Sequence, residues 1–161
     1  TLEEAGHLET VITQNVDGLH EAAGSSVLEI HGNGKRVACE SCDRTESLAV
    51  ARAQIDDGTL PPECSACGGV LKPDVVLFGE QLPGVTLQQA KQHVRDAEVL
   101  LAIGSSLTVE TAASLPRIAT RTGATLAIVN LEETPVSESA AFDIRADVTD
   151  VLPAISDAVE S

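Results

Sequence analysis

Residues 99–132 have the sequence VLLAIGSSLTVETAASLPRIATRTGATLAIVNLE, and this stretch decides the fold class. Its two ends, Val99–Ile103 and Thr125–Val129, are apolar at successive positions, which is typical of parallel strands buried on both faces. Leu107–Thr122, between them, has a helical pattern with an expected break near Pro116. A strand, a helix and a strand in this order predict a parallel α/β sheet with right-handed crossovers.

The same alternation extends outward along the chain. Further apolar strands are expected at Thr10–Thr13, Val27–Ile30 and Val75–Phe78, and further helices at Leu87–Ala97 and Val151–Val159. The glycine-rich turn that opens a dinucleotide-binding sheet is missing from this pattern. We therefore predict a Rossmann-like parallel sheet that is incomplete at its N-terminal end.

Four cysteines interrupt the series in two short pairs: Cys39 and Cys42, then Cys64 and Cys67. Two CxxC knuckles at this separation are typical of a structural zinc ion held by four thiolates. Disulfides or a redox CxxC are the alternatives, but nothing marks the chain as secreted, and a redox motif does not explain why it occurs twice. We predict one structural Zn²⁺ ion.

The cysteines also suggest a division of the chain. Residues 35–72 are expected to form a small zinc module inserted into a Rossmann-like domain, which comprises residues 1–34 and 73–161.

Composition limits the possible partners and the setting of the protein. The formal net charge is -15, from 25 Asp and Glu against 10 Lys and Arg, which disfavours nucleic-acid binding. Strong acidity with few large apolar side chains is typical of a halophile. No apolar run suggests a membrane span or signal peptide, so we expect a cytoplasmic protein. With no Met in the chain, we expect it to be a piece of a longer protein.

Polar residues crowd the ends of three predicted strands, where α/β sheets bind ligands. They occur in the segments 13–20 (TQNVDGLH), 104–109 (GSSLTV) and 130–132 (NLE). Each is weak evidence alone, because Ser, Asn and Glu are common in caps and loops. Together they predict a nucleotide site. His31 follows another apolar strand and is the candidate general base, although a lone histidine is more often structural.

Taken in order, these motifs resemble the sirtuins, the NAD-dependent protein-lysine deacylases. The resemblance rests on TQNVDGLH, the His31–Gly32 pair, the two cysteine pairs, PDVVLFGE at residues 73–80, GSSLTV and VNLE. It implies a Rossmann-type domain and a zinc-bearing domain, with NAD and an acyl-lysine protein or peptide as ligands. The family's N-terminal Gly-Ala-Gly loop would precede Thr1, and Ser105 stands where the family usually has Thr.

The resemblance also implies roles for individual residues. The catalytic set comprises His31 as base, with Asn15 and Asp17 orienting the nicotinamide ribose. The cofactor-binding set comprises Gln14, Asn15, Val16, Asp17, Gly104, Ser105, Ser106, Asn130, Leu131, Glu132 and Val148. The substrate-peptide set comprises Val76, Phe78, Gly79 and Glu80. The metal set comprises Cys39, Cys42, Cys64 and Cys67.

The implied function is transfer of an acyl group from lysine to ADP-ribose, releasing nicotinamide and O-acyl-ADP-ribose. We expect this chain alone to have little or no activity, because part of the NAD pocket is missing. The alternatives are mono-ADP-ribosyl transfer from the same pocket, or a zinc-stabilised peptide-binding module without catalysis.

Overall fold

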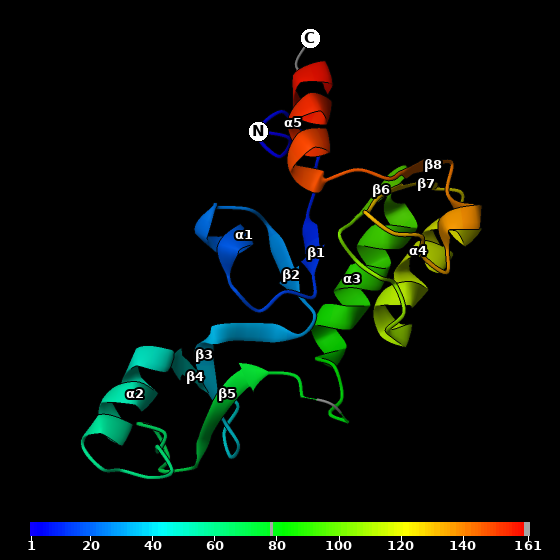
Figure 1. Ribbon diagram of the computed structural model, residues 1–161. Coiled ribbons are helices and arrows are strands. Elements are labelled where there is room, and N and C mark those ends of the chain that lie inside the picture. The colour runs from blue at the N-terminus through cyan, green and yellow to red at the C-terminus, as the bar shows by residue number, and fades with distance from the viewer. Residues whose placement is uncertain (78, 160–161) are drawn as a thin grey trace. The chain divides into compact units, whose positions relative to one another are not determined.

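The computed structural model describes residues 1–77 and 79–159, without the side chains of Glu110 and Thr111. Its elements, labelled in Figure 1, are β1 (Val11–Thr13), α1 (Leu19–Ala22), β2 (Val27–Glu29), β3 (Gly32–Cys39), β4 (Thr45–Ser47), α2 (Leu48–Asp56), β5 (Leu71–Val75), α3 (Gly84–Asp96), β6 (Val99–Ile103), α4 (Glu110–Thr122), β7 (Thr125–Val129), the short 3₁₀ helix η1 (Ser137–Ser139), β8 (Phe142–Ile144) and α5 (Val148–Val159).

The chain forms two compact units. The first comprises Thr1–Thr10 and Leu87–Ser161, and the second comprises Val11–Thr86. The narrower module expected at residues 35–72 stays a prediction. Among the described residues, no helix is both long and apolar enough to cross a membrane.

The first unit contains a parallel sheet in the order β6-β7-β8. Helix α4 packs against β6 and β7, which it connects. The core is apolar because Leu126 and Ile128 of β7 are almost fully buried and contact Leu107 and Val136. The strand, helix and strand expected over residues 99–132 are therefore confirmed, and Gly123 caps α4 in the left-handed conformation.

The break expected near Pro116 does not occur, since α4 runs through this residue. Proline removes one backbone hydrogen bond from a helix interior. Here Pro116 lies on the buried face of α4, with Ala112 and Ala119. Packing of this face against the sheet compensates for the lost bond.

The second unit contains two small sheets. Strands β1 and β2 pair in parallel, and β3 lies between β4 and β5 in an antiparallel sheet. The core of the antiparallel sheet is small, and two of its buried members are cysteines; it comprises Val37, Cys39, Ala51, Cys64 and Leu71. So small a core predicts dependence on a bound metal ion.

The strand expected at Val75–Phe78 is wrong in its position. β5 covers Leu71–Val75 instead, and Val76 and Leu77 lie beyond its end. The reason is the partner strand: β3 begins at Gly32, which lies opposite Val75, so the ladder ends there. Pro73 is tolerated because β5 is an outer strand of its sheet. Phe78 lies outside the described residues.

Candidate functional site

The four cysteines form one cluster. Their sulfurs all lie within 4.8 Å of one another, with Cys39 and Cys64 buried and Cys42 and Cys67 exposed. The Sγ atoms of Cys39 and Cys67 are 3.6 Å apart, and those of Cys42 and Cys64 are 3.8 Å apart. A tetrahedral zinc ion with bonds of about 2.3 Å requires sulfurs about 3.8 Å apart. The predicted four-thiolate arrangement is confirmed, and its geometry fits zinc.

The local backbone favours ionisation of one of these thiols, that of Cys39. The N–H of Ser41 donates to Cys39 Sγ at 3.3 Å, and this bond is the main cause that lowers the pKa of the Cys39 thiol to about 7. A thiol with this pKa is partly ionised at neutral pH, as a metal ligand must be. Gly69 lets the second knuckle approach the first, because a Cβ there would lie 2.9 Å from Cys39 Sγ.

Two side chains outside the cluster hold the second knuckle. The Glu46 side chain, only 7% exposed, accepts hydrogen bonds from the backbone N–H and the hydroxyl of Ser65, at 3.0 and 2.9 Å. These bonds also hold the pKa of the Glu46 carboxyl below its ordinary value. Gln54 of α2 exchanges two hydrogen bonds with the backbone of Glu63. The residues flanking Cys64 are thus attached to β4 and α2.

We expect Glu46→Ala to increase the rate of zinc transfer to a chelator about tenfold, within the range known for residues that orient metal ligands. The reason is that Ser65 loses both bonds and the Cys64 knuckle becomes free to move. The measurement is stopped-flow absorbance with a chromogenic chelator. Glu40→Ala, which removes the same charge from an exposed position of the first knuckle, is the control. Equal rates for the two variants would contradict the role assigned to Glu46.

His31 lies between two segments of the second unit. Its backbone oxygen accepts a hydrogen bond from the N–H of Val76 at 3.0 Å, and its Nδ1 lies 3.2 Å from the carbonyl oxygen of Gln14. Because a carbonyl only accepts, this partner assigns the ring proton to Nδ1. Nε2 of the neutral ring then has a free lone pair, as a general base requires.

The loop after β1 presents the other residues expected near His31. The side chains of Asn15, Val16 and Asp17 are exposed, while hydrogen bonds fix the backbone of the loop. The N–H of Asn15 donates to Thr13 Oγ1 at 3.0 Å. Asp17 Oδ1 accepts from the N–H of Leu19, the first residue of α1, at 2.9 Å. Polar side chains on a fixed backbone next to a histidine can orient a ligand.

The segment after β5 is also fixed. Glu80 accepts two hydrogen bonds from Lys72 Nζ, at 3.0 and 3.1 Å, and one from the N–H of Leu77 at 3.0 Å. The bond from Leu77, followed by that from Lys72, lowers the pKa of the Glu80 carboxyl. Glu80 therefore stabilises a turn that contains Gly79, whose φ is 90°.

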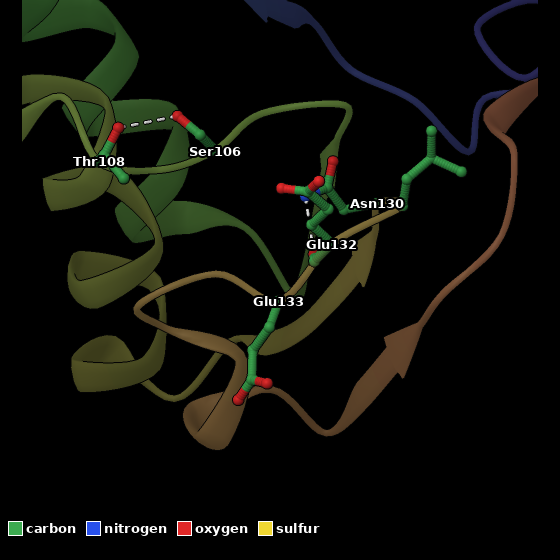
Figure 2. A pocket seen from close by; sticks show the side chains of 6 residues that line it. Ser106, Thr108, Asn130, Glu132 and Glu133 are labelled. Atoms are coloured by element: carbon green, nitrogen blue, oxygen red, sulfur yellow. Dashed lines mark hydrogen bonds between the residues drawn. The ribbon is translucent and has the colours of Figure 1, made fainter.

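The first unit places another set of predicted residues together. A cavity of about 340 Å³ lies at the carboxyl ends of β6 and β7, lined by Ser106, Thr108, Asn130, Leu131, Glu132 and Glu133. Figure 2 shows the side chains that line it. A second cavity of about 250 Å³ shares Asn130 and Leu131 with it and adds Gly104, Val129, Ala146, Asp147 and Val148. Carboxylate, amide and hydroxyl groups at this edge of a parallel sheet can bind a sugar diol and a phosphate.

The loop after β6 has a fixed backbone. Leu107 has a φ of 51°, in the left-handed region, and its side chain is buried against Leu126 and Ile128. Ser105 lies outside the lining of both cavities, and its Oγ accepts from the N–H of Leu107 at 3.3 Å. Ser106 bonds Thr108 through their hydroxyls at 2.9 Å (Figure 2). Burial of Leu107 thus maintains a strained loop that presents Ser106 to the cavity.

Sequence reasoning missed four residues that line these cavities: Thr108, Val129, Glu133 and Ala146. Thr108 and Glu133 adjoin predicted residues, and their polarity could have suggested them. Ala146 gives no signal at all.

Asp147 allows a test of the cavity wall by pH. Its Oδ1 accepts from the hydroxyl of Thr149 at 2.7 Å and from its N–H at 2.8 Å, and these bonds lower the pKa of the Asp147 carboxyl. A carboxyl whose pKa is lower in the folded than in the unfolded state stabilises the fold at pH values above its unfolded-state pKa of about 4. This contribution to stability is lost as the pH falls through the folded-state pKa. We expect Asp147→Ala to lower the melting temperature at pH 7 and to have a smaller effect at pH 3. If calorimetry showed the same decrease in melting temperature at pH 7 and at pH 3, this prediction would be contradicted.

Fold and sites together define an α/β protein with parallel sheets, a four-thiol metal module and polar cavities at the ends of its strands. The Sir2 family model matches residues 1–111. This chain belongs to the Sir2 family, so the resemblance to the sirtuins is confirmed.

Individual relatives are also similar. The chain is 52% identical over 156 residues to an NAD-dependent protein deacetylase of Haloarcula marismortui, covering 96% of this chain and 60% of the relative. It is 44% identical to a deacetylase of the same description from Sulfurisphaera tokodaii, covering 99% of this chain and 63% of the relative. The chain therefore spans about three fifths of the length of the curated relatives it matches.

Solved structures agree. A structure of Sir2 bound to acetylated peptide has a TM-score of 0.89 at 37% identity, covering 98% of this chain and 66% of that one. A complex of Sir2 with a p53 peptide and NAD⁺ has a TM-score of 0.87 at 37% identity, covering 98% of this chain and 65% of that one.

Proposed function

We propose that this chain contains the zinc module, the general base and the adenosine-binding edge of an NAD-dependent protein-lysine deacylase. The observation that carries the proposal is the hydrogen bond between His31 Nδ1 and the Gln14 carbonyl, which leaves Nε2 free on a histidine bonded to the loop that carries the exposed residues Asn15 and Asp17. The relatives of this family described above are named protein deacetylases.

The donor set of the first unit fits the adenosine part of NAD. Glu132 supplies a carboxylate for a ribose diol, and the hydroxyl of Ser106 lies at the end of β6, where a phosphate would approach. The adjoining cavity would hold the adenine ring, and it is lined by Gly104, Asn130, Leu131 and Val148. In the second unit, Gln14, Asn15, Val16 and Asp17 would hold the nicotinamide riboside.

NAD, when bound, supplies the sugar carbon to which the acyl oxygen is transferred. The task of the protein is then to orient a weak nucleophile and exclude water. His31 Nε2 would accept a proton from a ribose hydroxyl. Asn15 and Asp17 would orient that ribose, and their exposed side chains on a fixed loop support this role.

The segment of Val76, Phe78, Gly79 and Glu80 would hold the acyl-lysine peptide by pairing as strands. The turn fixed by Glu80 and Lys72 supports this, because a preformed edge loses less entropy on binding. The zinc ion would have a structural role, since four protein ligands leave no open position for catalysis. Four free thiols agree with a reducing compartment, and we propose a cytoplasmic location.

The proposal is tested with a chimaera in which this chain replaces the 156 matched residues of the Haloarcula marismortui relative. The chimaera is incubated in high salt with NAD and an acetyl-lysine peptide, and all products are identified by mass spectrometry. We expect deacetylated peptide and O-acetyl-ADP-ribose. An ADP-ribose group attached to the peptide or to the protein, with the acetyl group retained, would support ADP-ribosyl transfer instead, and unchanged peptide would contradict an enzymatic role.

A further inference from the structure

Strand β3 contains an irregular stretch directly after His31. Gly32 lies opposite Val75 of β5, but the next paired residue, Val37, lies opposite Pro73. Residues 33–36 of β3 therefore face a single residue of β5, Asp74. Backbone pairing with β5 is interrupted where β3 bulges in this way, while Arg36 still pairs with Ser47 of β4 on the other side. Other bonds must therefore join the bulge to β5.

Side chains supply these bonds in the bulge. Arg36 donates from Nε to Asp74 Oδ2 at 3.0 Å and from a terminal nitrogen to Glu29 Oε2 at 2.8 Å. Asn33, which is fully buried, donates to the other oxygen of Glu29 at 2.6 Å and accepts from the N–H of Lys35 at 2.8 Å. The Arg36 guanidinium thus joins β2, which precedes His31 in the sequence, to β5, which lies opposite the bulge.

The bulge also contacts the segments proposed to form the reaction site. The N–H of Gly34 donates to the carbonyl oxygen of Val16 at 2.7 Å, which holds the loop of Asn15 and Asp17. At the other end, Val76 donates to the backbone oxygen of His31. Gly32 has a φ of 79°, and a Cβ there would collide with the backbone oxygen of Asp74. The backbone of His31 therefore depends on where the bulge and β5 lie.

We propose that Arg36 is a positioning residue for His31, acting through its bonds to Glu29 and Asp74. The inference rests on the proposed function, in which His31 is the base. The Arg36 side chain is 35% exposed and those of Glu29 and Asp74 are 12% and 28% exposed, so this group is less screened by salt than fully exposed ion pairs. Only arginine presents a planar fork that bonds two separate carboxylates at once.

Removal of Arg36 leaves the carboxylates of Glu29 and Asp74 without the cation that joins them. Loss of one partner from such a group costs more than the intact bond contributes, because the remaining charges are poorly solvated. We expect the bulge to move away from β5 locally, and the His31 ring to lose its fixed orientation against the Gln14 carbonyl.

The first test uses the zinc-loaded 161-residue chain and Arg36→Gln, which keeps the length and polarity but not the charge. At pH 8, where a free imidazole is neutral, ¹⁵N shifts of the His31 ring report which nitrogen is protonated. We expect a single Nδ1–H form in the parent chain and a mixture of both tautomers in Arg36→Gln. We also expect the amide of Val76 to exchange with solvent about tenfold faster in the variant.

Two further variants keep the test decisive. Arg52→Gln removes an exposed arginine of α2 and should leave both signals unchanged. Arg36→Lys, which restores the charge but bonds only one carboxylate, should give an intermediate result if Arg36→Gln does not fold. An unchanged His31 tautomer and Val76 exchange rate in a folded Arg36 variant would overturn the proposal.

The second test measures kcat in the chimaera. We expect Arg36→Gln to lower kcat about tenfold with little change in the KM for NAD, because the adenosine site is in the other unit. An inactive chimaera with Arg36 intact would contradict the proposed function, while the His31 spectrum would still decide the role of Arg36. A kcat equal to that of the parent chimaera would contradict positioning of the base.

Discussion

Cys64→Ser is expected to unfold the zinc module, with loss of β3, β4, β5 and α2, and zinc removal by a chelator should do the same. The module has too little apolar core to fold without the metal, and two of its five buried residues are themselves ligands. A structural zinc ion supplies on the order of 10 kcal/mol of folding free energy in small modules.

The measurement is hydrogen exchange by mass spectrometry, with metal analysis of the same samples. We expect peptides from residues 32–75 to lose protection in Cys64→Ser, while β6 and β7 retain it. Ala66→Ser, which adds a hydroxyl between the two cysteines of the same knuckle, is the control and should bind one zinc ion. Less than about half an equivalent of zinc in the parent chain under reducing conditions would contradict the four-thiolate site.

His31→Ala in the chimaera is expected to lower kcat by about 10²-fold to 10⁴-fold, the usual contribution of a general base. The reason is that Nε2 of His31 is the group assigned to remove the ribose proton. The adenosine cavity lies in the other unit and keeps its lining residues, so the KM for NAD should change little.

His7→Ala provides the matched control, because His7 is exposed and lies in the N-terminal segment, away from the proposed site residues in the sequence. It should have the activity of the parent chimaera. Activity retained in His31→Ala would move the base to another residue.

Local patterns predicted the parts of the molecule that local forces form. The successive apolar residues of Val99–Ile103 and Thr125–Val129 require burial on both faces, so their strands were found at the correct residues. The cysteine spacing likewise requires two knuckles, whatever surrounds them. Because these strands were placed correctly, their carboxyl ends were also predicted correctly. The cavity residues Ser106, Asn130 and Glu132, which follow these ends, could therefore be predicted as well.

Other features depend on contacts between distant residues. Gly32–Cys39 contains two glycines and two cations and has no strand pattern, yet it pairs with both β4 and β5. Arg36 bonds Asp74, a residue 38 positions away, and nothing in the sequence near Arg36 indicates this partner. The shift of β5 to Leu71–Val75 also follows from the place where β3 begins, which only the pairing reveals.

We propose that the His31 site transfers an acyl group from lysine to ADP-ribose. The most direct test is the ratio of nicotinamide released to acetyl groups removed by the chimaera, with identification of the molecule that carries the acetyl group. We predict a ratio of about one, with every acetyl group on ADP-ribose, because each removed group consumes one NAD. Free acetate formed without nicotinamide release would contradict the account.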